Sequence, residues 1–350
     1  MKKPVKLQVS LCLPAILLLA MAACSSGGES GSSTTVVTLA SSPPGGMWYV
    51  VGGVLTDLIT DSVPQVRAIA EVTSGAVENV RLVGTGQSDM GFTIVKLARQ
   101  GFRGDPPFNQ AFPDLRMLYA SVEVGRLHMM VLKDSPLQDI CEVKGLQVAV
   151  GPAGHGSIPN LGEIFSAGCG FSFEDISPVY LPYGQSLTIL GDERVDAAVL
   201  YVSPPVAAIS EFGAVHDYRI LPVSQQVRDK VVAAFPYYID IVVPADAYQQ
   251  LTEDVPTVGT ANGVVANANL PDEVVYQIIK ATFENLDVLR RSHPTLENFG
   301  LDNAAEGGLI PYHPGAIRYY REQGVWTETE GFLSSPQEAG EAASTGNPSE

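Results

Sequence analysis

Basic residues are scarce in this sequence. Lysine and arginine number 21 against 38 aspartates and glutamates, which gives a formal net charge of −17 at pH 7. A protein with this charge repels polyphosphate, so the composition argues against nucleic acid and anionic membrane surfaces as partners. The 350 residues, 45% of them hydrophobic and 17% charged, are instead typical of a globular protein with a substantial core.

The sequence also lacks the motifs of common enzymes. The stretch GPAGHGS, residues 151–157, is similar to a phosphate-binding loop but does not have the Gly-Lys-Ser/Thr ending, and neither Gly-x-Ser-x-Gly nor His-Glu-x-x-His occurs. The five histidines show no metal-ligand spacing, and only His155 is a candidate ligand contact. We therefore expect a protein that is not an enzyme and that uses no metal or cofactor.

Only four cysteines are present, and two of them belong to the N-terminus. Lysines precede an apolar stretch over 9–20 that contains Cys12 and is too short to cross a bilayer, which is typical of an export signal. Leu-Ala-Met-Ala-Ala before Cys24 resembles the lipobox of bacterial lipoproteins. Residues 1–23 are predicted to be a lipoprotein signal peptide, Cys24 a lipid anchor and 24–35 a flexible tether. Ordinary secretory cleavage at Ala23 is the alternative.

The other two cysteines, Cys141 and Cys169, allow one disulfide in an exported protein. Two buried free thiols are the alternative. At the C-terminus, residues 331–350 have no apolar periodicity and are rich in Ser, Gly, Glu and Ala, which predicts a disordered tail.

One arrangement of strand, glycine loop and helix occurs twice. An apolar stretch over 36–40 predicts a strand. The loop SSPPGG follows it, and from Met47 onward apolar residues recur at the spacing of a helix. A second strand over 146–150 leads into GPAGHGS and a further helix. In both halves a glycine, Gly84 or Gly191, stands five residues before an aspartate that opens a strand.

Alternating strands and helices predict an α/β fold with parallel strands in two lobes. The segment after residue 235 has no third glycine loop, so we expect the chain to return to the first lobe there. This places lobe 1 at 36–134 plus 236–330 and lobe 2 at 135–235, joined by two crossings near residues 134 and 236. A long helix is predicted from Asp272 to Leu289.

The glycine loops have a physical use in such a fold. A helix N-terminus at the carboxyl end of a strand offers free N–H groups and about half a positive charge, and glycine lets an anion approach closely. Two such loops, one in each lobe, predict a site for a small anion between the lobes. Tyr183, Tyr237 and Tyr238 are candidate phenol donors to a carboxylate, with core packing as the alternative.

The chain resembles the TAXI family of solute-binding proteins of TRAP transporters. The resemblance runs from about residue 36 to 325 in six ordered blocks, of which SSPPGGMWYVVGG and FPYYIDIVVPADAY are two. It implies a type II periplasmic-binding-protein fold that closes on a small carboxylate, such as a glutamate-like compound or a dicarboxylic acid. It also implies an extracytoplasmic, monomeric receptor that delivers its solute to a TRAP membrane permease and contacts the membrane through the lipid anchor only. A sensory binding protein that reports to a membrane kinase is the alternative.

The family's motifs place its ligand-binding residues on named positions of this chain. These candidate ligand-binding residues are Ser41, Ser42, Gly45, Gly46, Met47, Tyr49, Ser74, Gly75, Gly154, His155, Gly156, Ser157, Tyr237 and Tyr238. Thr93 and Tyr183 are two further candidates. Two departures bear on the ligand: Ser42-Pro43-Pro44 replaces a common Gly-Gly-Thr, and Ile94-Val95-Lys96 replaces a frequent Gln-Ser-Asp. They put the solute's identity in doubt, since specificity rests on a few buried polar contacts, and a more apolar or more acidic solute would fit them.

Overall fold

The structure, a computed structural model, describes residues 34–326. The predicted signal peptide, the lipidation of Cys24, nearly all of the tether and the predicted tail over 331–350 lie outside the described residues. Within them a mixed sheet has the strand order β2-β1-β3-β10-β4-β7-β5-β6, with β8 paired to β4 and β9 paired to β10.

Three parallel strands form the sheet of lobe 1. β1 (Thr35–Ala40) lies between β2 (Val66–Glu71) and β3 (Met90–Ile94). The connecting helices are α1 (Met47–Ser62) and α2 (Ala76–Gly84), and α3 (Val95–Arg103) follows β3. α1 is an amphipathic helix because Met47, Val51, Leu55, Leu58 and Ile59 recur at helical spacing and are buried.

A second parallel triplet forms the sheet of lobe 2. β5 (Gln147–Ala149) lies between β6 (Ser177–Val179) and β7 (Ala197–Val202). α4 (Ser157–Ile164) follows β5, and α5 (Tyr183–Gly191) joins β6 to β7. The repeated strand, glycine loop and helix are thus confirmed, with one copy in each lobe.

The two aspartates of the repeat have the same role. Asp89 precedes β3 and accepts a hydrogen bond from the Thr38 N–H of β1 at 2.8 Å. Asp196 precedes β7 and accepts from the Gln147 N–H of β5, also at 2.8 Å. Each carboxylate therefore connects the start of one strand, β3 or β7, to the central strand of its lobe. The aspartate that follows the helix end and the turn thus satisfies a backbone N–H in both halves.

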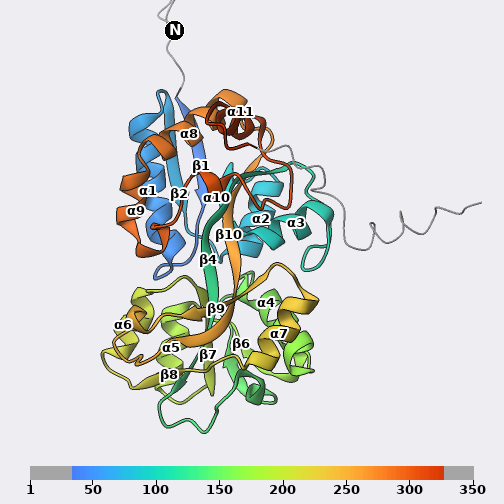
Figure 1. The fold of residues 1–350 in the computed structure, drawn as a ribbon, viewed down its shortest axis with the longest axis vertical. Coiled ribbons are helices and arrows are strands. Elements are labelled where there is room, and N and C mark those ends of the chain that lie inside the picture. Colours follow the sequence, from blue (N-terminus) through green and yellow to red (C-terminus); the bar gives the residue numbers. More distant parts are fainter. Residues whose placement is uncertain (1–33, 327–350) are drawn as a thin grey trace, which may run out of the picture. The chain divides into compact units, whose positions relative to one another are not determined.

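Two long strands, β4 (Leu115–Leu132) and β10 (Val255–Asn267), pass between the lobes (Figure 1). β10 pairs with β3 over 262–266 and with β9 (Tyr238–Val243) over 255–260, while β4 turns from β10 to β7 near Arg126. The crossings therefore lie near residues 123–126 and 259–262, and the predicted positions, 134 and 236, are wrong. Both strands are largely apolar on either side of the crossings, whereas Glu123, Arg126 and Asn262 lie at the crossings themselves.

The hydrophobic cores divide at the same place. One core takes residues from 37–122 and 264–320 and belongs to lobe 1. Two smaller cores take residues from 127–258 and belong to lobe 2. The segment 238–258, predicted to belong to lobe 1, packs into the second lobe because β9 pairs there with β10.

The remaining helices cover the two sheets. Lobe 2 carries α6 (Ala207–Gly213), α7 (Gln225–Ala234) and the short strand β8 (Tyr218–Ile220), and lobe 1 carries α8 (Asp272–Glu284), α9 (Leu286–Ser292), α10 (Leu301–Ala304) and α11 (Pro314–Glu322). The helix predicted over 272–289 is divided at Asn285. Between residues 34 and 326, no helix has the length and apolar character needed to cross a membrane.

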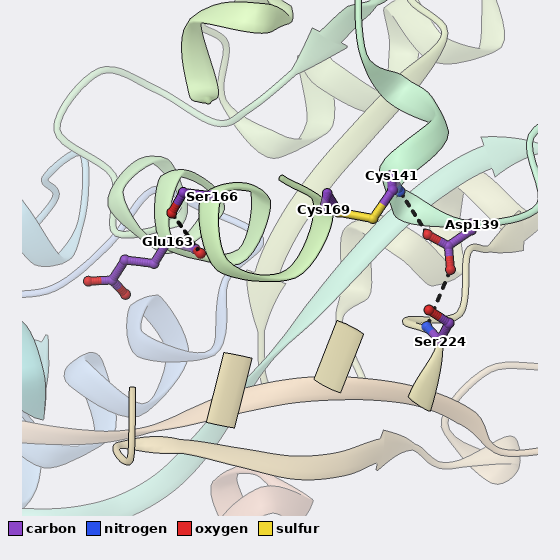
Figure 2. The surroundings of a disulfide bond; sticks show 6 residues. All are labelled: Asp139, Cys141, Glu163, Ser166, Cys169 and Ser224. Atoms are coloured by element: carbon purple, nitrogen blue, oxygen red, sulfur yellow. Dashed lines mark hydrogen bonds between the residues drawn. A yellow bond between two sulfur atoms is a disulfide. The ribbon is translucent and has the colours of Figure 1, made fainter. Parts of the chain in front are cut away.

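Cys141 and Cys169 form a disulfide, with their Cα atoms 5.3 Å apart (Figure 2). Cys169 ends a helical segment, Phe165–Cys169, that continues α4, and Cys141 lies in a short turn of helix over Ile140–Val143. Asp139 supports this turn, because it accepts from the Cys141 N–H at 2.9 Å and from the Ser224 N–H at 3.3 Å. The bond fixes the end of the helical segment that begins at the second glycine loop.

Candidate ligand-binding site between the lobes

A small cavity of about 30 Å³ lies between the two lobes. Lobe 1, lobe 2 and the two crossing strands all contribute to its wall. The lining residues are Ser42, Gly46, Met47, Trp48, Ala76, Ile94, Glu123, His155, Gly156, Ser157, Tyr183, Tyr201, Val202, Ser203 and Asn262.

The N-terminus of α1 opens into this cavity. Gly46 is the N-cap in extended conformation, and no described side chain caps this end. The first N–H groups of a helix have no partner within it, and they carry the positive end of its dipole. Because Met47 and Trp48 line the cavity, their N–H groups are available to an anion there, whereas the Gly46 N–H donates to the Pro43 carbonyl at 3.4 Å.

The loop before α1 is held by buried polar side chains. Asn79 Nδ2 donates to the Ser41 carbonyl at 2.7 Å and to the Phe92 carbonyl at 2.8 Å. The Ser41 hydroxyl donates to the Glu71 carbonyl at 2.7 Å. Ser41 therefore anchors the loop to β2, whereas Ser42 faces the cavity.

The N-terminus of α4 reaches the cavity from lobe 2. His155 Nδ1 lies 2.8 Å from the Ser157 hydroxyl, and His155 Nε2 lies 2.7 Å from the Tyr183 hydroxyl. Burial lowers the pKa of His155 to about 4, so the ring is neutral at pH 7. Since both ring nitrogens already have partners, His155 positions α4 and Tyr183 around the cavity.

Glu123 of β4 brings a carboxylate into the cavity wall and is only 6% exposed. Trp48 Nε1 donates to its Oε1 at 3.0 Å, Asn262 Nδ2 donates to the same atom, and Ser203 Oγ contacts Oε2. Burial raises the pKa of Glu123 to about 7, although the hydrogen bonds from Asn262 and Trp48 and the charge of Arg126 oppose the rise. These contacts join lobe 1, lobe 2 and both crossing strands.

The two lobes touch beside the cavity. The Val77 and Glu78 N–H groups of α2 donate to the Gly154 carbonyl of lobe 2 at 3.2 and 3.3 Å. Gly75, at φ +117°, lies so close to His155 that a Cβ there would come within 2.8 Å of the ring. The Gly154 carbonyl thus occupies the N-terminus of α2, and the lobes are closed upon each other.

The structure brings part of the predicted site together. Seven candidates line the cavity: Ser42, Gly46, Met47, His155, Gly156, Ser157 and Tyr183. Nine do not: Ser41, Gly45, Tyr49, Ser74, Gly75, Thr93, Gly154, Tyr237 and Tyr238. Tyr49 is 44% exposed, while Ser74, Gly75 and Gly154 belong to the contact between α2 and lobe 2.

Tyr237 and Tyr238 lie at a second contact between the lobes. Both hydroxyls donate to Glu163 of α4 at 2.8 Å, and the Lys96 ammonium group lies 5.2 Å from the centre of each ring. Lys96 and Tyr237 also line an outer groove between α3 and α4. The phenols therefore hold a carboxylate of the protein itself.

Sequence reasoning missed the polar residues of the crossing strands, Glu123 and Asn262, and also Tyr201 and Ser203. A usable signal existed for the first two: Glu123 lies within the largely apolar LYASVEVGRLHMMVL, and Asn262 within VPTVGTANGVVAN. An isolated polar residue in a buried strand must be paired, and it often marks a site. Among residues 34–326, no group of three His, Cys, Asp or Glu side chains is arranged to hold a metal ion.

Two α/β lobes, joined by two long strands and enclosing a cavity at helix N-termini, define a type II periplasmic-binding-protein fold. The chain belongs to the NMT1-like family, whose model matches residues 39–324. The finer assignment to the TAXI family stays a prediction.

Several solved structures are similar to this chain at low identity. The aliphatic sulphonate binding protein SsuA of Escherichia coli is 14% identical, with 83% of this chain and 84% of that chain covered and a TM-score of 0.42. A second similar structure is the alkanesulfonate-binding protein SsuA of Xanthomonas axonopodis pv. citri, bound to MOPS. It is 15% identical, with 84% of this chain and 81% of that chain covered and a TM-score of 0.47. A third is PhnD1 of Prochlorococcus marinus in complex with methylphosphonate. It is 11% identical, with 75% of this chain and 89% of that chain covered and a TM-score of 0.47.

Proposed function

We propose that this protein is the extracytoplasmic solute receptor of a TRAP-type secondary transporter. It binds a small carboxylate in the cavity between the lobes and delivers it to the membrane permease. The observation that carries the proposal is that the cavity is walled by the N-termini of α1 and α4, one from each lobe. The Cys141–Cys169 disulfide supports an oxidising compartment outside the cytoplasm.

The chemistry at the N-terminus of α1 suits a carboxylate, whereas at the start of α4 the Ser157 N–H already donates to His155 Nδ1 at 3.0 Å. The N–H groups of Met47 and Trp48 can donate to its oxygens, and the hydroxyl of Ser42 can do so when it turns away from the Pro43 carbonyl, to which it donates at 3.2 Å. Hydrogen bonds to a charged group contribute about 1.5–3 kcal/mol each, so three or four support micromolar binding after the entropic cost of association. The net charge of −17 does not prevent this, because salt screens that field beyond about 8–10 Å.

Closure of the lobes completes the site. Gly156 reaches the cavity from lobe 2, close to Ile94 and Ala76 of lobe 1. A solute that contacts both helix ends binds the closed state more tightly than the open one, and therefore shifts the equilibrium toward closure.

The test is to denature the purified protein and identify the small molecules that it releases by mass spectrometry. A carboxylate among them, added back to ligand-free protein at 100 times its Kd, is expected to raise the unfolding temperature by roughly 5 °C. A released solute without an anionic group would contradict the proposed carboxylate specificity.

A further inference from the structure

Within residues 34–326, the Glu123 carboxylate has no cationic partner in direct contact. Its three hydrogen-bonding partners, Trp48, Asn262 and Ser203, are all neutral. Two of them donate to Oε1, so in the described part of the chain Oε2 has only the Ser203 hydroxyl. A buried carboxylate is expensive to leave without compensation, and a positive or N–H-bearing group placed against Oε2 would supply it.

Ser203 can give up its contact with Glu123 at no loss of hydrogen bonding. A hydroxyl has one hydrogen, yet Ser203 Oγ has two acceptors within reach: Glu123 Oε2 and the Val124 carbonyl, the latter at 3.0 Å. When the hydroxyl donates to Val124, Oε2 is free to accept from a ligand.

Asn262 adds a second free acceptor beside Glu123. The residue is 4% exposed and lines the cavity, and its Oδ1 has no hydrogen-bond partner among the described residues. Its Nδ2 is oriented by the hydrogen bond to Glu123, so the amide presents oxygen on its other side. Gly125 leaves room for this amide, since a Cβ there would come within 2.8 Å of Nδ2. A buried acceptor without a donor costs free energy unless a ligand satisfies it.

We propose that the solute presents an N–H group, a protonated amine or an amide, to Glu123 Oε2 and Asn262 Oδ1, in addition to the anionic group that α1 receives. This rests on the proposed function, and it makes Glu123 the residue that selects amino or amide carboxylates over plain ones. The proposal also explains why the wall of an anion site contains the carboxylate of Glu123. The N–H group of the solute would lie between this carboxylate and the solute's own anionic group.

The test is calorimetric titration with matched pairs of compounds. L-glutamate against 2-oxoglutarate and L-leucine against 4-methyl-2-oxopentanoate exchange an amine for a carbonyl oxygen, and succinamate against succinate tests an amide. In the native protein, the N–H-bearing member of at least one pair is expected to bind about 10- to 100-fold more tightly. Glu123→Gln should lose most of this preference, whereas Glu284→Gln, which removes an exposed carboxylate of α8, should keep it.

The outcomes separate this inference from the proposed function. Equal binding of both members of each pair, or a preference that Glu123→Gln retains, overturns the inference and leaves the carboxylate site standing. If none of the six compounds binds the native protein and denaturation releases no carboxylate, the proposed function fails, and the inference fails with it. The far-ultraviolet circular dichroism of Glu123→Gln verifies that the variant is folded.

Discussion

The ammonium group of Lys96 in lobe 1 forms an ion pair with the carboxylate of Glu163 in lobe 2. Both side chains are largely buried, at 2% and 15% exposure. Burial lowers the pKa of Lys96 to about 8, although the charge of Glu163 opposes this. A charged pair enclosed between two lobes exists only when the lobes are together, so this contact favours the closed state.

Lys96→Met is expected to weaken closure. It leaves Glu163 without its cation, and breaking a buried pair costs far more than breaking an exposed one. We predict that the Kd for the solute rises by about tenfold or more and that the radius of gyration measured by X-ray scattering increases. Lys280→Met is the matched control, because it breaks the exposed Lys280–Glu284 pair within α8. Unchanged affinity and size would show that the pair does not hold the lobes.

Gly156→Ala should hinder closure by steric contact. The added Cβ would lie 2.6 Å from Ile94 Cδ1 and 3.1 Å from Ala76 Cβ, both in lobe 1. A smaller closed population reduces the apparent affinity in proportion, by about three- to tenfold here. Gly162→Ala lies within α4, whose N-cap is Gly156; among the described residues its Cβ would meet only Phe173 Cβ, at 3.9 Å, so it should bind normally. Equal titration curves for the two variants would refute this account of closure.

Glu123 should make the stability of the protein depend on pH. Because burial raises its pKa from 4.5 to about 7, the folded protein binds more protons than the unfolded chain between these values. The free energy of unfolding therefore falls as pH rises through this window. Glu123→Gln removes this ionisable group. The free energy of unfolding of the variant minus that of the native protein should therefore increase by up to about 3 kcal/mol between pH 4.5 and pH 7.5. Urea unfolding at several pH values measures this, and a difference independent of pH would contradict the raised pKa.

The disulfide should stabilise lobe 2 substantially. Cys141 and Cys169 are 28 residues apart, and closing a loop of this length lowers the entropy of the unfolded chain by an amount equivalent to about 3–4 kcal/mol. The double variant Cys141→Ala/Cys169→Ala should lose roughly this free energy of unfolding in urea. Reducing agent should destabilise the native protein and leave the variant unaffected. Equal sensitivity of both proteins to reducing agent would exclude a structural role for the bond.

Local patterns in the sequence predicted the parts of the site that depend on local structure. The two glycine loops and the helices after them follow from residue spacing alone, and Gly46 and Gly156 indeed meet at one cavity. Glu123 and Asn262 could each have been singled out as an isolated polar residue in a buried strand, but their contact depends on pairing between segments more than 130 residues apart, which no local pattern shows. Tyr237 and Tyr238 were predicted to donate to the solute, but they lie outside the cavity and their hydroxyls donate to the protein's own Glu163.

The positions of the crossings could not be predicted for a similar reason. Residues 127–132 are again mostly apolar after the interruption at Glu123 and Arg126, and they pack into a different core from residues 115–122. The core to which a buried strand residue belongs depends on its tertiary neighbours, not on its own hydrophobicity.

Calorimetric titration of the solute into three proteins tests most directly whether the cavity at the start of α1 is the binding site. A Cβ at Gly46 would lie 3.1 Å from Ser42 Oγ, so Gly46→Val fills the space beside the first turn, whereas Gly53→Val adds its side chain to open space on the same helix. We predict saturable binding to the native protein and to Gly53→Val, and binding weaker by about a hundredfold in Gly46→Val, with all three proteins folded. Native affinity in Gly46→Val would contradict the account.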